Sequence, residues 1–185
     1  MLPSVVFPAG RRGRLRAINA TWGRRAHAVF VEHEGDRDSI AWPQFERATC
    51  RDEDYPRRLV VPSSIGSSEG VARLRWLLTI DVDFAFMCND HTAVIAPNLV
   101  CYLHTLSPSE PLYLGHALAN GDGTLFNSGA AGYVLTRALL GIVGVKNSSS
   151  CWEKTSKWLQ GNPGILLARC IKSLGGVFPG DTRDA

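Results

Sequence analysis

A short apolar segment that stops at a polar turn constrains the fold of this chain most. Residues 84–88 read Phe-Ala-Phe-Met-Cys, a run typical of a fully buried strand, and the triplet Asn-Asp-His follows at 89–91. An apolar helix is expected over about 97–106, because Pro97 suits a first helical turn. In open α/β sheets, ligands bind in the crevice outside the carboxyl ends of the strands, so the turn at 89–91 is the first candidate site.

Segments with helical and strand-like patterns alternate along the rest of the chain. The predicted helices cover 11–22, a segment capped by Ser67 or Ser68, 97–106 and a segment capped by Thr136, and the predicted strands cover 26–31, 59–62, 84–88 and 112–114. A strong turn signal lies at 119–123, and the sheet is expected to continue beyond it. With 185 residues and no internal repeat, the chain fits one α/β domain with a mixed or mainly parallel sheet.

Charge and hydropathy weaken several classes of function. Arginines crowd the segment 11–25, but no helix-turn-helix, zinc-finger or RNA-stacking signature accompanies them, so a solvated helix face is favoured over a nucleic-acid partner. No apolar run reaches the about 18 residues that span a bilayer, and the start of the chain lacks the form of a signal peptide. A membrane anchor or a signal is therefore expected only outside this chain.

The polar turn after the apolar run has two interpretations. Asn89, Asp90 and His91 carry side chains that can hold a cation and a phosphate at the end of a strand. Asn and Asp also favour turns for purely local reasons, so a plain surface turn is the alternative. Both interpretations stay open on the sequence alone.

The cysteines do not suggest a metal site. Their spacings contain no CxxC or Cys/His pattern typical of zinc; they are Cys50, Cys88, Cys101, Cys151 and Cys170. Two glycosylation sequons, at Asn19 and Asn147, fit a secretory location.

Five segments occur in an order that resembles glycosyltransferase family 31, and most of all its core 1 β1,3-galactosyltransferases, which are related to the fringe enzymes. These segments are Ala20-Thr21-Trp22, Asn89-Asp90-His91-Thr92, Tyr113-Leu114-Gly115, the run 128–135, and Cys170 followed by 180–184. The match runs from about Arg11 to the end of the chain. The resemblance implies a single GT-A (Rossmann-like) domain over 1–185 and a lumenal location in the Golgi with type II membrane topology. It also implies manganese-dependent transfer of galactose from UDP-galactose to the 3-hydroxyl of N-acetylgalactosamine on Ser or Thr of a glycoprotein.

The resemblance assigns donor-binding roles to the turn and to the first helix. The family's metal motif, three aspartates and a threonine, corresponds to Asn89, Asp90, His91 and Thr92 here. Asp90 remains a carboxylate, and His91 can replace a carboxylate ligand of Mn²⁺, which would make metal binding more dependent on pH. Together with Asn89 and Asp90, the pair Thr21 and Trp22 would lie near the nucleotide. A core aromatic on the first helix is the alternative for Trp22.

The small residues at 127–132 are expected where the backbone closely approaches another group. By the resemblance, Ser128, Gly129 and Ala130 face the donor sugar and the acceptor, and Ala130 stands in place of a glycine. Its methyl group would crowd the sugar or forbid a positive φ. Tyr133 is expected in the core.

The expected catalytic base is missing. Family members carry a Glu-Asp pair where this chain has Pro163 and Gly164, and neither residue takes a proton. Unless Glu153, Asp181 or another acid substitutes, the loss of a general base removes about 10² to 10⁴ in rate.

The resemblance also pairs Cys151 with Cys170 in a disulfide, which suits an oxidising compartment, and leaves Cys88 and Cys101 as buried free thiols. A family histidine lies beyond the segment 180–184, whereas this sequence stops at Ala185. We therefore expect a fragment, incomplete at the carboxyl terminus, or a degenerate homologue whose membrane contact depends on a segment not in this chain. Homodimer formation is an open alternative.

Three hypotheses remain. The chain is a galactosyltransferase by ancestry that uses a UDP-sugar donor and a glycoprotein acceptor. Alternatively, it is a non-catalytic homologue that acts as a chaperone-like or glycan-binding protein. The third hypothesis is an unrelated α/β domain whose motifs match by chance.

Overall fold

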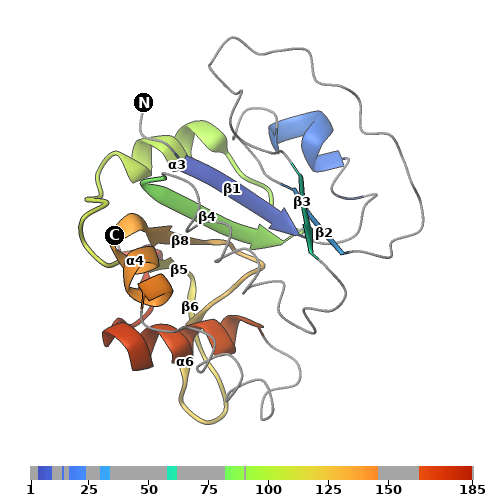
Figure 1. Cartoon of the computed structure of the whole chain (residues 1–185). Coiled ribbons are helices and arrows are strands. Elements are labelled where there is room, and N and C mark those ends of the chain that lie inside the picture. Colours follow the sequence, from blue (N-terminus) through green and yellow to red (C-terminus); the bar gives the residue numbers. More distant parts are fainter. Residues whose placement is uncertain are drawn as a thin grey trace.

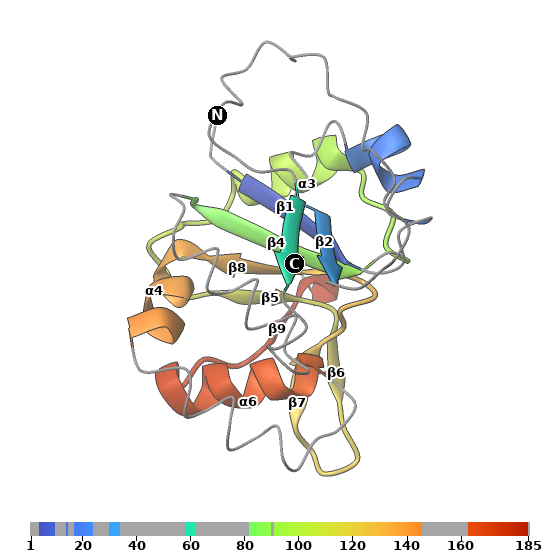
Figure 2. The same ribbon diagram turned by 45° about the vertical axis from the view of Figure 1, so that its right-hand side comes forward.

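A mixed seven-stranded sheet with helices on both faces forms the centre of the computed structural model (Figures 1 and 2). The structure describes residues 4–9, 14, 17–23, 30–33, 58–61, 82–89, 91–145 and 163–184. The strands, in their order across the sheet, are β3 (Arg58–Val61), β2 (Phe30–His33), β1 (Ser4–Ala9), β4 (Phe84–Asn89), β8 (Tyr133–Thr136), β5 (Tyr113–Gly115) and β9 (Gly180–Asp181). The described helices are η1 (Asn19–Gly23), α3 (Ala96–Leu103), α4 (Arg137–Val145), α6 (Pro163–Gly175) and η3 (Thr182–Asp184).

The strand directions bring the ends of several strands to the same edge of the sheet. β8 runs antiparallel to both of its neighbours, β4 and β5, whereas the other strand pairs are parallel. The carboxyl ends of β1, β4, β5 and β9 therefore meet the start of β8 at the same edge, which we call the carboxyl edge. Mixed α/β content with such a sheet is compatible with the Rossmann-like fold that the sequence predicts.

The apolar run that predicts β4 is buried because both of its faces are covered. On one face Phe84 packs with Leu103 of α3 and Val134 of β8. On the other face Ala85 and Met87 belong to a larger core that α4 and α6 cover, with members that include Tyr113, Tyr133, Leu135, Leu139 and Ile171. A strand that is buried on two faces reads as a continuous apolar run rather than as an alternating one, which explains the sequence signal.

Several predicted elements are present with shifted bounds. The strand predicted at 59–62 is β3 at Arg58–Val61. The strand predicted at 26–31 is observed only as Phe30–His33, and residues 26–29 lie outside the described part. The helix predicted over 97–106 is α3, and it ends at Leu103, where a turn bonds Thr105 and Leu106 back to it. The helix predicted after Ser67 or Ser68 lies outside the described residues.

The predicted basic helix over 11–22 is not regular to its end. Residues 14, 17 and 18 are helical, and the chain then widens into the π-helical turn η1. Thr21 has φ −112° and ψ −105°, which are not helical values. Its hydroxyl donates to the carbonyl oxygens of Ala17 at 2.7 Å and Ile18 at 3.2 Å, so a local side-chain contact replaces the regular helix.

The main sheet continues beyond the turn at 119–123, as predicted, through β8 and β9, but not with the strand that directly follows the turn. β6 (Ala117–Ala119) and β7 (Leu125–Asn127) form a separate two-stranded antiparallel sheet, and the chain enters β8 only afterwards. The turn itself is present, since the Asn120 amide donates to the Thr124 carbonyl at 2.9 Å and Gly123 has φ +79°. The turn signal was correct because it is local, whereas the strand partner depends on packing against α6.

The prediction that Thr136 caps the following helix is wrong. Thr136 directly precedes α4, but its hydroxyl donates to the Glu110 carbonyl at 2.6 Å and accepts from the Leu112 amide at 2.9 Å. The side chain is fully buried and fastens the segment before β5 to the end of β8.

Within the described residues, no helix has the length and apolar character needed to cross a membrane.

Candidate functional site

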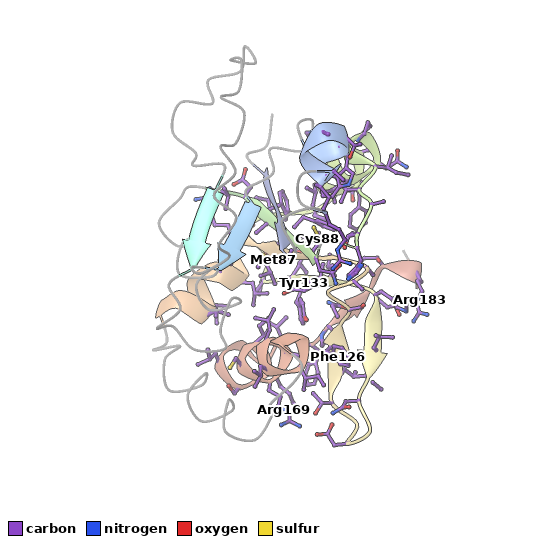
Figure 3. The ribbon with its side chains drawn as sticks, turned by 90° about the vertical axis from the view of Figure 1, so that its right-hand side faces the viewer. Met87, Cys88, Phe126, Tyr133, Arg169 and Arg183 are labelled. Atoms are coloured by element: carbon purple, nitrogen blue, oxygen red, sulfur yellow. The ribbon has the colours of Figure 1, made fainter. Side chains whose placement is uncertain are left out.

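The strand ends at the carboxyl edge bring several predicted site segments together. Ala9 of β1 lies opposite Asn89 of β4, and Gly115 of β5 lies opposite both Tyr133 and Asp181. Figure 3 shows Cys88, Met87 and Tyr133 next to one another at this end of the sheet. The edge at which the sequence predicts a ligand site is therefore made by the ends of β1, β4, β5 and β9 and the start of β8.

The turn after β4 is held by Asn89. Its Oδ1 accepts a hydrogen bond from the His91 amide at 3.0 Å and lies 3.3 Å from the Thr92 hydroxyl, and its backbone oxygen accepts from the Thr92 amide at 3.3 Å. This is the local turn chemistry that Asn favours, so the surface-turn interpretation describes the backbone correctly. Because the amide oxygen contacts both His91 and Thr92, Asn89 acts as a brace for this turn. Asp90 lies outside the described residues.

Thr92 connects this turn to the glycine-rich segment. Its hydroxyl donates to the Ala130 carbonyl at 2.8 Å, and only 9% of the residue is exposed. Two further bonds hold the segment, from the Ser128 amide to the His116 carbonyl at 2.9 Å and from the Gly132 amide to the Ser128 carbonyl at 3.1 Å. The structure thus brings together two predicted segments that lie 38 positions apart in the sequence.

Close backbone approach in this segment occurs at Gly132 rather than at Ala130. Gly132 has φ +84°, and a Cβ atom there would lie 2.2 Å from Cζ of Phe86. Ala130 is exposed, so its methyl group points to solvent, and whether it crowds a sugar stays a prediction. The expected close approach is therefore confirmed, and the partner is the Phe86 ring of β4. Tyr133 is buried in the core as predicted.

Asp181, one of the acids that could replace the missing base, forms hydrogen bonds and an ion pair with Arg183. Its carboxylate accepts from the Arg183 amide at 3.0 Å and Nε at 2.9 Å, and it pairs with Nη2 of the same side chain. The side-chain hydrogen bond from Arg183, then the backbone bond, lower the pKa of Asp181 to about 2, and the nearby His116 adds to this effect. A carboxylate with so low a pKa is a weak general base near neutral pH.

The positions at which the family carries its acidic pair supply no acid here. Pro163 and Gly164 begin α6, whose first turn contains no acidic residue. Proline suits this place in a helix, because its missing amide proton is not needed there. Glu153 lies outside the described residues. The base therefore remains unidentified.

The predicted metal and nucleotide residues are only partly described. His91 is exposed in the turn after β4, and no group of three or more His, Cys, Asp or Glu in the described residues lies close enough together to hold a metal ion. A manganese site that uses Asp90 and His91 therefore stays a prediction. Thr21 is exposed, and Trp22 is half-buried rather than in the core, so their contact with a nucleotide stays a prediction.

The described cysteines separate into bonded and free thiols. Cys170 is fully buried in α6 and is disulfide-bonded, with a partner that lies outside the described residues, so its pairing with Cys151 stays a prediction. Cys88 is a buried free thiol, as expected. Cys101 is free but exposed, contrary to the prediction, because it lies on α3 away from the core-facing residues Leu99 and Leu103.

Two polar groups in this region were not found from the sequence. Asn127 is fully buried and donates from its backbone amide to the Tyr113 hydroxyl and from Nδ2 to the Tyr113 carbonyl, both at 3.1 Å. Its Oδ1 is buried without a hydrogen-bond partner among the described residues. Arg169 pairs with Asp122 across 47 positions of sequence. Asn127 begins the predicted run 127–132, but its bonds to Tyr113 and the pair of Arg169 with Asp122 are long-range contacts that the local sequence does not indicate.

Comparison with known proteins points to one enzyme class. The chain is 30% identical over 150 residues to glycoprotein-N-acetylgalactosamine 3-beta-galactosyltransferase 1 of Xenopus laevis. This chain is related to galactosyltransferases. The similarity covers 74% of this chain and 38% of the relative, so the chain spans well under half of that protein's length. It supports a galactosyltransferase-like relationship without selecting a particular member, and no family model matches the chain.

Proposed function

We propose that this chain contains the donor-binding part of an inverting glycosyltransferase. The enzyme would move galactose from UDP-galactose to the 3-hydroxyl of N-acetylgalactosamine on Ser or Thr of glycoproteins. The observation that carries the proposal is the hydrogen bond from Thr92 to Ala130, which joins two predicted donor-site segments at the carboxyl edge. Nucleotides bind at this edge in open α/β sheets, and the similarity to a galactosyltransferase supports the same reaction class.

The residues of this edge would bind and orient the donor. Asn89 fixes the backbone of the turn and so the position of His91. A manganese ion held by Asp90 and His91 would offset the charge that develops on the diphosphate leaving group. Ser128 and Gly129 would line the space for the sugar and the acceptor, next to the carbonyl of Ala130 that Thr92 holds.

A calorimetric titration with UDP, with and without Mn²⁺, tests this proposal. We expect binding that needs Mn²⁺ and that weakens at least about tenfold in Asp90→Ala, because loss of a carboxylate ligand removes a charge-assisted contact. Asp83→Ala is a matched control, since Asp83 precedes the same strand at its opposite end and makes only a partly exposed ion pair with Arg137. No binding by the folded wild-type chain, or equal binding by Asp90→Ala, would overturn the proposal.

A non-catalytic homologue is the second candidate function. It is favoured by the absence of an acid in the first turn of α6 and by the depressed pKa of Asp181. A turnover assay with UDP-galactose and a peptide carrying O-linked N-acetylgalactosamine separates the two candidates. Release of UDP coupled to transfer supports the enzyme, whereas Mn²⁺-dependent UDP binding without transfer supports the homologue that binds without turnover.

The Golgi lumen is the compartment that we propose for this domain. The disulfide at Cys170 supports the assignment, since disulfides persist in oxidising compartments and are rare in reducing ones. The two sequons add support, because glycosylation of Asn19 or Asn147 requires passage through the secretory route. Enzymatic deglycosylation of the protein from a secretory host, followed by mass measurement, tests this assignment.

A further inference from the structure

A pocket lies between the β6–β7 hairpin and helix α6, away from the carboxyl edge. It has a volume of about 340 Å³. The hairpin contributes Asp122, Thr124 and Leu125, α6 contributes Arg169 and Lys172, and Phe178 and Pro179 close it from the segment that leads to β9. Figure 3 shows Arg169 well below Cys88, with Phe126 at an intermediate height. None of these residues belongs to the proposed donor site.

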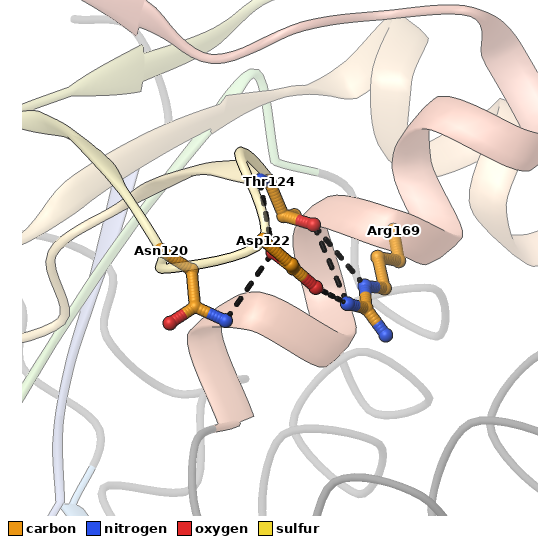
Figure 4. A network of polar contacts seen from close by, with 4 residues as sticks. All are labelled: Asn120, Asp122, Thr124 and Arg169. Atoms are coloured by element: carbon orange, nitrogen blue, oxygen red, sulfur yellow. Dashed lines mark hydrogen bonds and ion pairs between the residues drawn. The ribbon is translucent and has the colours of Figure 1, made fainter.

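The guanidinium of Arg169 is held in a fixed position by the hairpin (Figure 4). Its Nη2 pairs with Asp122, and both Nε and Nη2 lie 3.4 Å from the Thr124 hydroxyl. Asp122 is itself held by the Thr124 amide at 3.0 Å. The hydrogen bonds from Thr124, followed by the charge of Arg169, lower the pKa of Asp122, so the pair stays ionised at neutral pH. The Nη1 group of Arg169 makes none of these contacts.

Lys172 adds a second positive charge one turn further along α6. Its ammonium lies 5.1 Å from the centroid of the Phe178 ring, in a cation–π arrangement. Among the described residues, no carboxylate forms an ion pair with Lys172. Three charged residues line the pocket, namely Asp122, Arg169 and Lys172. Asp122 neutralises Arg169, so the positive charge of Lys172 is in excess.

The rest of the lining is apolar and open to solvent. Phe178 is 55% exposed and Leu125 is 45% exposed. Large apolar side chains that gather on a surface beside a charged group commonly mark a binding site. The pocket therefore combines one unneutralised cation with a hydrocarbon wall.

We infer that this pocket binds an acidic peptide segment. A Glu or Asp carboxylate would accept from Lys172 and from Nη1 of Arg169, and a neighbouring apolar side chain would pack on Phe178 and Leu125. Charge complementarity favours a single carboxylate over a diphosphate, because the lining has one excess positive charge. An acidic sugar fits less well, since its ring hydroxyls would find few partners along the apolar wall. A pocket of this size suits one side chain and its neighbour.

An NMR titration of the isotopically labelled chain with short capped peptides tests this inference. The probe is acetyl-Gly-Phe-Glu-Leu-Gly-amide. One control peptide carries Gln in place of Glu, and another carries Ala in place of Phe and Leu. We expect the Glu peptide to shift the amide signals of Gly123 and Lys172 with a Kd in about the millimolar range, and each control peptide to bind at least about fivefold more weakly.

Variants of the protein locate the binding. Lys172→Met keeps the apolar stem and removes the charge, and we expect about three- to tenfold weaker binding of the Glu peptide. Arg137→Met is the matched control, because Arg137 is an exposed cation on α4, outside the pocket. Phe178→Ala is expected to weaken binding, whereas Ile95→Ala removes a similarly exposed apolar side chain elsewhere and leaves it unchanged.

Three results of the peptide titrations would overturn the inference. These are equal binding of the Glu and Gln peptides, equal effects of Lys172→Met and Arg137→Met, and the absence of shifts at about 10 mM peptide. Shifts of the same signals by N-acetylneuraminic acid, without shifts by the Glu peptide, would reassign the pocket to acidic sugars and also overturn it. UDP titrated into the same samples reports on the donor site separately, so the two proposals fail independently.

Discussion

The hydroxyl of Thr92 donates a 2.8 Å hydrogen bond to the carbonyl oxygen of Ala130, across 38 positions of sequence. This bond fixes the turn after β4 against the glycine-rich segment before β8. The turn and the segment are both predicted to contact the donor, so the Thr92 side chain connects two parts of the candidate site. Thr92 is thus a positioning residue whose loss is expected to affect both stability and ligand binding.

Replacing Thr92 with Val should destabilise the fold, because the mostly buried Thr92 side chain would lose its hydrogen bond to the Ala130 carbonyl. We expect a loss of about 1 to 2 kcal/mol in the free energy of unfolding, measured by urea denaturation. Thr105→Val is a matched control: its hydroxyl donates to the Tyr102 carbonyl at 2.7 Å, but at an exposed position where water replaces it. Equal losses in the two variants would show that the bond from Thr92 has no special role.

Adding one methyl group at Gly132 should be more costly. Its Cβ atom would lie 2.2 Å from Cζ of Phe86, and the φ of +84° is unfavourable for any L side chain. We expect Gly132→Ala to lower the free energy of unfolding by about 2 to 4 kcal/mol. Gly121→Ala, where no heavy atom lies within 4 Å of the added Cβ, should change it by less than about 1 kcal/mol.

A second variant separates steric overlap from backbone strain at Gly132. Phe86→Ala removes the ring that the new methyl group would meet, at the cost of a cavity. The double variant Gly132→Ala with Phe86→Ala should therefore lose less unfolding free energy than the sum of the losses in the two single variants. The part of the Gly132→Ala loss that persists in the Phe86→Ala background is the backbone strain. Strict additivity in the same denaturation experiment would contradict a clash between these residues.

The sequence predicts elements whose signals are local. The run at 84–88 predicted β4 because a strand buried on both faces needs apolar residues at every position, and α3 on one side and α4 and α6 on the other provide that cover. The turn around Gly123 was equally predictable from the sequence, since its hydrogen bonds join neighbouring residues. Such signals state that an element exists, but they do not state its partner.

Features that depend on distant contacts were missed or wrongly assigned. A cap by Thr136 was a reasonable local expectation, but the segment at Glu110 and Leu112 competes for the same hydroxyl. Arg169 and Asp122 are ordinary surface residues in the sequence, and only the packing of α6 against the hairpin brings them together. The candidate site was predicted as two segments, and their direct contact required the fold.

The ion pair of Asp181 with Arg183 predicts a specific response to acid. The folded-state pKa of Asp181 is about 2, below the usual 3.8. A carboxyl group with a depressed pKa stabilises the fold fully above its unfolded pKa, and this contribution is lost as the pH falls toward the folded value. The difference in unfolding free energy between wild type and Asp181→Asn should therefore shrink from pH 4 to about pH 2. Urea denaturation at several pH values measures this difference.

Arg183→Gln provides the control for that titration. Since the Arg183 side chain is the largest cause of the low pKa, its removal should raise the pKa of Asp181 toward the usual value. In the Arg183→Gln background, the effect of Asp181→Asn should then depend much less on pH in the acidic range. An unchanged pH dependence would mean that another group lowers the pKa of Asp181.

The thiol chemistry of the chain should divide the cysteines into three groups. Peptide mapping without reduction is expected to link Cys170 to Cys151, and a link to Cys50 would contradict this pairing. Closing the loop between Cys151 and Cys170 is worth about 3 kcal/mol in the chain-entropy model, so Cys151→Ser should lower the melting temperature clearly.

In the native protein a maleimide should react with the exposed Cys101 and not with the buried Cys88, which should react only after unfolding. Labelling of Cys88 at the native rate of Cys101 would contradict its burial and show that this end of β4 opens readily to solvent.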